Sequence, residues 1–426
     1  MKKLKILIIP IIIPYPITDG GKICTFSFID KLQNVNDFTL FLHSNNLEDA
    51  RNIELLKNKL PNVNIVTSQD YKYEEGIKSN FNFGEVIKSF LRNIYDWFFK
   101  TNLANTKYSQ IDLMENVGRT TPFFPHSKKY IEKLSLLFQN YEFDIIQIEY
   151  TENLNLINCL PVNVKKVYIE IESRYSVLND YINIKAEKSL FDSYVCNNTK
   201  MLETVYLSKY DAILALSEID RERLKKLLPN TPIYSSPFSV SDENIQKIDK
   251  ENFRIEKIIF IGPEAHYPNK DAVLFFLNDV YSQFDFSIPV HIVGNWSEET
   301  KNQLSSDKIV FEGYVEKINE FLKNSVMIVP MRLGGGGLRT KILLAMAQGI
   351  PIISTSLGAD GFDFIHKEHF LLANIPIDFF EEVSFLMKNR DKAFEMALKA
   401  QNLFIDKFSQ QQTADVRNGI YHKIAN

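Results

Sequence analysis

The stretch from Ser325 to Gly361 constrains the fold most strongly, because it contains the pattern strand, glycine turn, helix, strand. The apolar run 326–330 predicts a short buried strand, and the run 351–355 predicts a second one. Between them, apolar residues three and four positions apart predict a helix: Ile342, Leu343, Met346 and Ala347. A helix that joins two strands in this way is typical of a parallel sheet covered by helices.

Four consecutive glycines, 334–337, join the first strand to the helix. Glycine lacks a Cβ, so Gly335, Gly336 and Gly337 can bring backbone N–H groups close to one ligand and direct them at it together. A flexible surface turn is the alternative interpretation. The backbone entropy lost when four glycines become ordered favours a functional turn that binds an anion.

The residues after the glycines add positive charge to this turn. A helix start at Leu338 would supply free N–H groups and the partial positive charge of a helix N-terminus. Arg339 and Lys341 add two full charges, and the arginine can bind a phosphate through two hydrogen bonds. The segment is therefore a candidate phosphate site, although two solvated basic residues on a surface turn would give the same pattern.

The alternation of short apolar runs with helical patterns extends along the chain, whose 426 residues are enough for two domains. We predict an α/β fold with an N-terminal Rossmann-like domain at 1–237 and a polar, proline-containing linker at 238–252. A second Rossmann-like domain is predicted at 253–405, and a final helix at 406–426 that packs back on the first domain.

Glycines also follow other predicted strands. Gly20 and Gly21 come after the first strand of the chain, and Gly262 and Gly313 follow two strands of the second domain. Ligands of open α/β sheets bind at the carboxyl ends of the strands, so these glycines can present N–H groups to a substrate. For Gly20 and Gly21 an ordinary tight turn is the alternative.

Composition limits the compartment and the partners. A net charge of −4 gives no overall electrostatic attraction for nucleic acid, so any phosphate binding must be local. The three cysteines contain no C-x-x-C pair, which indicates a reducing compartment and argues against a disulfide framework or a zinc site. Prolines interrupt the apolar run at 6–13 and no cleavage site follows it, so we predict a strand and a cytoplasmic location rather than secretion.

The segment near 71–130 interrupts the alternation and is rich in aromatic residues. Apolar residues at helical spacing form one face within it: Ile87, Phe90, Leu91, Ile94 and Phe98. This face either binds an acceptor or touches a membrane, or it packs on its own domain. Its modest basic content favours packing on its own domain.

Candidate catalytic carboxylates stand at the ends of two predicted strands in the first domain. Glu149 ends one strand, and Glu172 closely follows the next. A carboxylate at this edge can accept a proton from an acceptor hydroxyl. Pairing with Arg174 or capping of a helix are the structural alternatives. No D-x-D pair of aspartates, which would hold a metal ion and a diphosphate, occurs in the sequence.

The run PMRLGGGGLRTKILLAMAQGIP at 330–351, followed by STSLGADG at 354–361, resembles the donor-site segment of family 4 glycosyltransferases. These enzymes have two Rossmann-like domains in the GT-B fold. The run is most similar to the branch whose motif is GGGTRLKILEAMA. Residues 14–21 resemble the first loop of the family and 260–269 the opening of its second domain, so the resemblance covers nearly the whole chain.

The resemblance implies transfer of a sugar from a nucleotide diphosphate sugar to a glycan, lipid-linked or protein acceptor. It implies a retaining reaction in which Arg339, Lys341 and the helix start at Leu338 stabilise the leaving diphosphate without a metal ion or another cofactor. It also implies that Gly313 approaches the base, and that glycines 20–21 reach the phosphates when the domains close. The expected location is the cytoplasm, with peripheral contact at the inner face of the membrane.

The sequence departs from the family pattern at two positions. Many members carry two glutamates that bind hydroxyl groups of the donor sugar and the ribose, and Gly336 and Leu344 occupy those positions here. Leu344 removes the expected ribose contact and, with the aromatic segment, supports an alternative function as a non-catalytic subunit that binds an acceptor or a partner transferase. An epimerase of nucleotide sugars is a further alternative, which the glycine motif disfavours.

Overall fold

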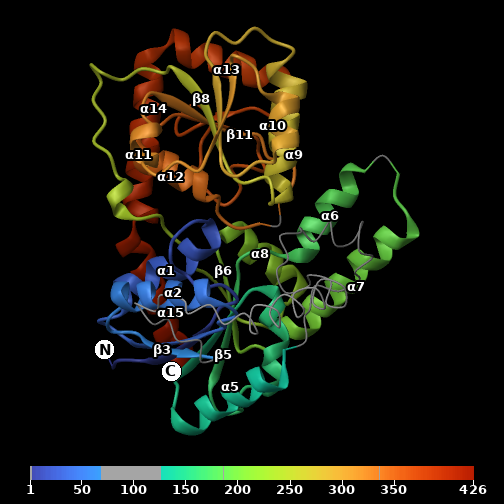
Figure 1. The fold of residues 1–426 in the computed structure, drawn as a ribbon, viewed down its shortest axis with the longest axis vertical. Helices are drawn as coiled ribbons and strands as arrows, with labels where there is room; N and C mark the ends of the chain where they lie inside the picture. Colours follow the sequence, from blue (N-terminus) through green and yellow to red (C-terminus); the bar gives the residue numbers. More distant parts are fainter. Residues whose placement is uncertain (1, 69–125, 186, 335) are drawn as a thin grey trace, which may run out of the picture.

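The computed structural model describes residues 2–68, 126–185, 187–334 and 336–426, and places them in two α/β domains, one above the other in Figure 1. Over these residues, the N-terminal domain has one parallel sheet in the strand order β3-β2-β1-β4-β5-β6-β7, and the C-terminal domain has another in the order β10-β9-β8-β11-β12-β13. The first sheet contains β1 (Lys5–Ile9), β2 (Asp37–Leu42), β3 (Asn64–Thr67), β4 (Ile145–Glu149), β5 (Lys165–Glu170), β6 (Ala212–Ala215) and β7 (Ile233–Ser235). The second contains β8 (Lys257–Ile261), β9 (Val290–Val293), β10 (Ile309–Gly313), β11 (Ser325–Val329), β12 (Ile352–Ser354) and β13 (Leu371–Leu372).

Helices cover both faces of each sheet, which buries the strands on both sides and explains their continuous apolar runs. In the N-terminal domain these are α1 (Gly20–Leu32), α2 (Leu47–Lys59), α5 (Lys128–Asn140), η1 (Thr151–Cys159), α6 (Arg174–Ile184), α7 (Leu190–Leu207) and α8 (Glu218–Leu227). The rest of the chain forms η2 (Asp242–Asn244), α9 (Tyr267–Phe275), η3 (Phe276–Tyr281), α10 (Glu298–Leu304), α11 (Ile318–Phe321), α12 (Thr340–Gln348), α13 (Pro376–Lys388), α14 (Arg390–Leu403), η4 (Phe404–Phe408) and α15 (Gln410–Ala425).

The strand order of each sheet reverses beside its first strand. β1 pairs with β2 on one side and β4 on the other, and β8 pairs with β9 and β11. Ligands of open α/β sheets bind in the crevice at such a switch point. The carboxyl ends of the two sheets face each other. The evidence is a contact of 3.2 Å between Glu172, which follows β5, and His266, which follows β8.

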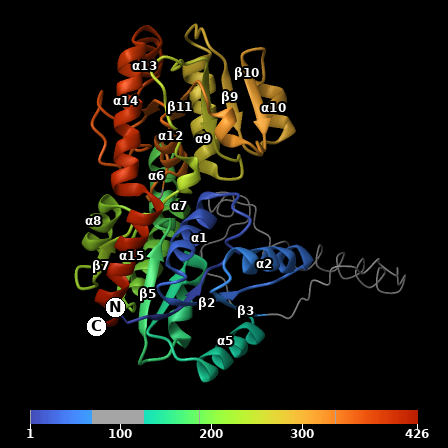
Figure 2. The same cartoon turned by 90° about the vertical axis from the view of Figure 1, so that its left-hand side faces the viewer.

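The final helix returns to the N-terminal domain, as the sequence predicts, and α15 lies beside α1 in Figure 2. The rings of Tyr421 and Phe28 are 6.4 Å apart, and the Tyr421 hydroxyl donates to Gln147 Oε1 at 2.6 Å. Arg417 of the same helix is only 1% exposed and donates to Ser236. The predicted two-domain α/β architecture with a returning helix is therefore confirmed.

Two predictions concern the relation of the chain to a membrane. The apolar face predicted at 87–98 lies outside the described residues, and of the segment near 71–130 the structure describes only 126–130, which leads into α5. Among the described helices, none combines the length and the apolar composition that a bilayer crossing requires.

Candidate functional site

The glycine turn after β11 packs against the N-terminal domain. Gly336 and Gly337 have φ angles of +98° and +79°, a region that glycine adopts without strain. The Gly337 N–H donates to Asp220 Oδ2 at 2.8 Å, and a Cβ on Gly337 would lie only 3.0 Å from the Ile171 carbonyl oxygen. Both the backbone conformation and the close approach therefore require glycine here. Gly335 lies outside the described residues.

Asp220, in the first turn of α8, places a carboxylate where the glycine turn would bind an anion. Its Oδ2 also accepts from the Ser217 hydroxyl at 2.6 Å, and its Oδ1 lies 3.1 Å from Arg223 Nη1. The cavity that remains beside Gly337 has a volume of about 20 Å³, which is close to the space of one water molecule. A diphosphate can therefore reach the Gly337 N–H only if the Asp220 carboxylate moves away from it.

Arg339 is the strongest anion-binding group of the site. Its Nη1 donates to the carbonyl oxygens of Gly336 and Gly337 at 2.8 and 2.9 Å. Its Nε and Nη2 atoms are buried, and no described residue accepts a hydrogen bond from them. Burial lowers the pKa of the guanidinium, although the nearby carboxylates of Asp220 and Glu172 oppose this shift. A cation whose buried donor atoms lack partners is suited to bind an anion.

Lys341 lies in the first turn of α12. Its Nζ donates to Asn269 Oδ1 at 2.8 Å and lies 3.8 Å from the centre of the Phe260 ring. Burial, together with the charge of Arg339, lowers the pKa of Lys341 well below its usual range. A Cβ on Gly262 would lie 2.5 Å from the Asn269 side chain, so this predicted site glycine makes room for the amide that holds Lys341.

The N-termini of α1 and α12 meet between the domains. α12 begins at Thr340 rather than at Leu338, whose side chain is buried. α1 begins at Gly20, and a Cβ on Gly20 would lie 2.5 Å from Thr340 Oγ1. A Cβ on Gly21 would lie 2.1 Å from the Tyr150 hydroxyl oxygen. The structure thus brings the first-domain glycines to the helix that carries the basic residues.

Two further predicted site residues are Glu149 and Gly313. Glu149 is 1% exposed, and its carboxylate accepts from Thr25 Oγ1 at 2.5 Å and from Gln147 Nε2 at 2.8 Å. Burial raises the pKa of Glu149, although these hydrogen bonds oppose the shift. Gly313 ends the edge strand β10 with φ +68°, and no heavy atom lies within 4 Å of its Cβ position. Glu149 is thus engaged inside its own domain, and the backbone of Gly313 borders open space.

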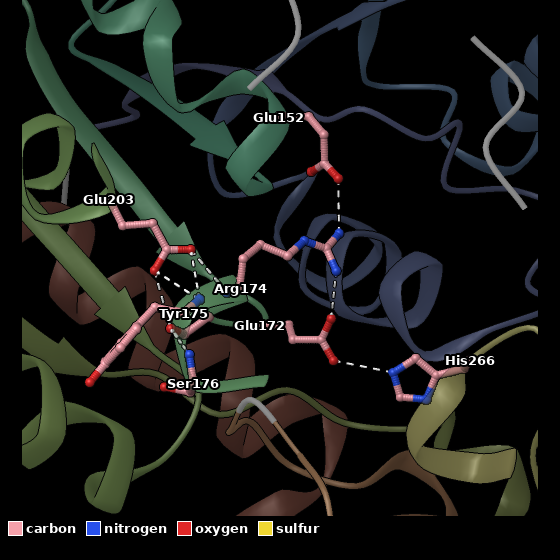
Figure 3. Close-up of polar contacts among 8 residues, drawn as sticks. Glu152, Glu172, Arg174, Tyr175, Ser176, Glu203 and His266 are labelled. Atoms are coloured by element: carbon pink, nitrogen blue, oxygen red, sulfur yellow. Dashed lines mark hydrogen bonds and ion pairs between the residues drawn. The ribbon is translucent and has the colours of Figure 1, made fainter. Parts of the chain in front are cut away.

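Glu172 links the two domains (Figure 3). Its Oε1 lies 3.2 Å from His266 Nε2, and its Oε2 accepts from Arg174 Nη1 at 2.9 Å. Arg174 Nη2 donates in turn to Glu152 Oε1 at 2.8 Å. Burial alone would raise the pKa of Glu172, but the hydrogen bond to His266 and the charges of His266 and Arg174 lower it to about 2. The arrangement favours the ion-pair alternative for Glu172, because both of its carboxylate oxygens are engaged.

A second buried carboxylate, Glu203 of α7, holds the start of α6 (Figure 3). It accepts from the N–H groups of Arg174 at 2.9 Å and Tyr175 at 3.3 Å. Burial raises the pKa of Glu203 to about 7, against these hydrogen bonds. Burial, with the charge of Glu203, raises the pKa of Glu170 well above its usual range. In the part of the chain that the structure describes, no three His, Cys, Asp or Glu side chains are arranged to hold a metal ion.

Three residues of this interface do not follow from the sequence: Asp220, Tyr150 and His266. The pattern of Ser217 and Asp220 is typical of a helix start and gives no sign that the carboxylate reaches the other domain. Tyr150 has φ +68°, a conformation that costs a residue with a side chain about 1–3 kcal/mol. Nothing local in the sequence indicates this strain or the contact of His266 with Glu172, because both depend on packing between distant segments.

Residues 255–389 match the family model of glycosyl transferases group 1. The matched range contains the glycine turn, Arg339, Lys341 and the strands from β8 to β13. A protein of Klebsiella pneumoniae, described as an uncharacterized 44.6 kDa protein in the cps region, is 22% identical over 376 residues, which are 84% of this chain and 90% of that protein.

Three solved structures resemble the whole chain. Sucrose-phosphate synthase from Thermosynechococcus elongatus has a TM-score of 0.66 at 12% identity, with 99% of each chain covered. TarM of S. aureus has the same TM-score, identity and coverage. HepE of Anabaena in complex with UDP-glucose has a TM-score of 0.62 at 10% identity, with 98% of this chain and 99% of that chain covered. These likenesses confirm the predicted GT-B fold. With a glycosyl transferases group 1 domain at 255–389 inside that fold, the chain is a glycosyltransferase.

Proposed function

We propose that the chain moves a sugar from a nucleotide diphosphate sugar to a glycan, lipid-linked or protein acceptor, with retention of the anomeric configuration and without a metal ion. The observation that carries this proposal is the partly buried pair Arg339 and Lys341 beside the glycine turn. Two donor atoms of Arg339 lack a partner among the described residues, so the pair is matched to an anion that the free protein does not supply.

The chemistry of glycosyl transfer supplies such an anion. As the bond between sugar and diphosphate breaks, negative charge grows on the departing diphosphate. Burial lowers the pKa of both Arg339 and Lys341, which means that the site disfavours its own positive charges until an anion arrives. The two cations therefore interact most favourably with the state in which the diphosphate charge is largest, and this lowers the barrier.

The comparisons support the substrate classes. HepE was crystallised with UDP-glucose, and another structure of it holds UDP and glucose. The Klebsiella relative is described as lying in a cps region, which supports assembly of a surface polysaccharide as the setting of the reaction. We place this reaction in the cytoplasm, with acceptors that are presented at the inner face of the membrane.

A donor panel tests the proposal. UDP-glucose, GDP-mannose and ADP-glucose are added at millimolar concentration, and at least one should raise the melting temperature. Arg339→Ala and Lys341→Ala should each weaken that binding roughly 10-fold or more, as expected for hydrogen bonds to charged groups. Arg332→Ala is the matched control, because both guanidinium bonds of Arg332 go to Asp271, at 3.1 and 2.6 Å.

Failure of every donor to bind, or unchanged affinity in both site variants, would contradict the proposal.

The stereochemistry of the reaction and its independence of metal ions are tested separately. Anomeric proton couplings of the product, measured by NMR, report retention or inversion. Activity that survives treatment with EDTA and exhaustive dialysis supports the metal-independent reaction, and activity restored only by a divalent ion contradicts it.

A further inference from the structure

Tyr150 stands at the switch point of the N-terminal sheet, directly after β4. Its φ angle of +68° is unusual for a residue with a large side chain. Such conformations persist only where the surrounding structure holds them, and they cluster at binding sites. The backbone of Tyr150 is thus held in a costly conformation beside the crevice where ligands of this sheet type bind.

The hydroxyl group of Tyr150 is a second feature of this residue that lowers the stability of the fold. Its oxygen is buried, and no described residue forms a hydrogen bond with it. The hydroxyls of two buried tyrosines, by contrast, have partners: Tyr210 donates to the Leu154 carbonyl at 2.9 Å, and Tyr421 donates to Gln147. Burial, with the charge of Glu149, raises the pKa of Tyr150 well above its usual range, so the group stays a neutral donor. A phenylalanine would pack here without the unpartnered hydroxyl.

The surroundings place this hydroxyl beside the donor site. It packs against the first turn of α1 so closely that a Cβ on Gly21 would lie 2.1 Å from its oxygen. The neighbouring Gly20 approaches Thr340, the residue that follows Arg339. At the start of α1 the Lys22 N–H donates to Asp19 Oδ1 at 3.0 Å, and the other first N–H groups have no partners within the helix, so they favour negative charge nearby. The hydroxyl therefore lies where the N-terminal domain meets the helix that carries the diphosphate-binding cations.

We infer that Tyr150 is a substrate-positioning residue whose hydroxyl donates a hydrogen bond to an oxygen of the nucleotide diphosphate sugar. This inference rests on the proposed function, since the donor at Arg339 and Lys341 brings the oxygen to this point. The oxygen belongs either to the diphosphate or to the transferred sugar, and both accept from a neutral hydroxyl. The bond is formed by the N-terminal domain, so it adds to donor binding when the domains are closed around the substrate.

The test compares Tyr150→Phe with the wild type in the full chain. Without ligand, Tyr150→Phe should melt at the wild-type temperature or above it, because it removes a buried hydroxyl that has no protein partner. Tyr210→Phe is the matched control and should melt at a lower temperature, because it removes a hydroxyl that has one. Titration calorimetry then measures the dissociation constants of UDP, GDP, ADP and their glucose or mannose conjugates for all three proteins.

The source of the oxygen decides which ligands lose affinity. If the hydroxyl binds a phosphate oxygen, Tyr150→Phe weakens binding of the nucleoside diphosphate itself, roughly 10- to 100-fold. If it binds a hydroxyl of the sugar, only the intact donor is affected, roughly 2- to 10-fold. In either case Tyr210→Phe keeps the wild-type dissociation constants.

Equal dissociation constants of Tyr150→Phe and the wild type for every ligand would overturn the inference while leaving the proposed function intact. A lower melting temperature of Tyr150→Phe with unchanged affinity would assign the hydroxyl a structural role. A wild type that binds none of the ligands would overturn the proposed function and, with it, the role of Tyr150.

Discussion

The substitution Gly21→Ala distinguishes two effects on stability at the edge of the site: helix propensity and side-chain packing. Gly21 is the second residue of α1 and has no positive φ, so propensity alone predicts a gain of up to about 1 kcal/mol. The structure predicts a loss instead, because the added Cβ would lie 2.1 Å from the Tyr150 hydroxyl oxygen and 3.3 Å from Ile12 Cδ1. Overpacking of this kind costs about 1–3 kcal/mol, so a net loss of up to about 2 kcal/mol remains even if the whole propensity gain is realised.

Thermal unfolding measures this difference. For a domain of this size, 1 kcal/mol shifts the melting temperature by about 2–4 °C. Gly419→Ala is the control, because Gly419 lies within α15 and no heavy atom is within 4 Å of its Cβ position. That variant should gain up to about 1 kcal/mol. Tyr150→Phe should rescue Gly21→Ala, since it leaves the nearest ring carbon 3.3 Å from the new Cβ.

The double-mutant cycle of Gly21→Ala and Tyr150→Phe should therefore show a coupling of about 1–3 kcal/mol. The reasoning fails if Gly21→Ala stabilises the protein as much as Gly419→Ala does. It fails equally if Gly21→Ala destabilises the protein by the same amount with and without the Tyr150 hydroxyl, because the clash would then lie elsewhere.

Three further predictions concern charge. Burial raises the pKa of Glu203 from its ordinary 4.5 to about 7, so the stability that its protonated form contributes is lost as the pH rises through this window. Urea titrations at several pH values should show that Glu203→Gln loses less stability than the wild type over this range. The same loss of stability in both proteins would contradict the assignment. Burial, with the charge of Arg339, lowers the pKa of Lys341, and a bound diphosphate should raise it again. Donor binding should therefore take up a proton and weaken at alkaline pH, and calorimetry in two buffers of different ionisation enthalpy counts that proton. Asp220→Asn removes the negative charge of the carboxylate that accepts from the Gly337 N–H, so nucleoside diphosphates should bind about 10-fold more tightly. Weaker binding would mean that the carboxylate supports the glycine turn.

Local patterns were enough to predict the architecture. The apolar runs 257–261 and 290–293 coincide with β8 and β9, since buried parallel strands consist of continuous apolar residues. The first strand ends at Ile9, earlier than its apolar run, because Pro10 has no N–H for the ladder. β7 and β13 gave no signal, because strands of three and two residues are too short to show a period.

The candidate site was predictable only in part. Some of its residues belong to one segment of the sequence, whereas others come together only when distant segments pack against each other. Arg339 and Lys341 follow from their spacing after the glycines, which is a property of one segment. The carboxylate on Gly337 and the strained Tyr150 come from segments far away in the sequence, and only the folded chain shows which surfaces meet. Glu149 shows the converse: its position at a strand end suggested the crevice, but its side chain binds Thr25 of α1 inside the domain.

The position of α15 has a consequence for synthesis of the protein on the ribosome. The N-terminal domain is translated first, yet residues that pack on its helix α1, such as Tyr421 against Phe28, belong to 410–425. One side of α1 therefore stays uncovered until the ribosome has translated the whole second domain. Ribosomes that stall before 410 would release a chain whose apolar α1 surface is open to chaperones and proteases, even if both sheets had already formed.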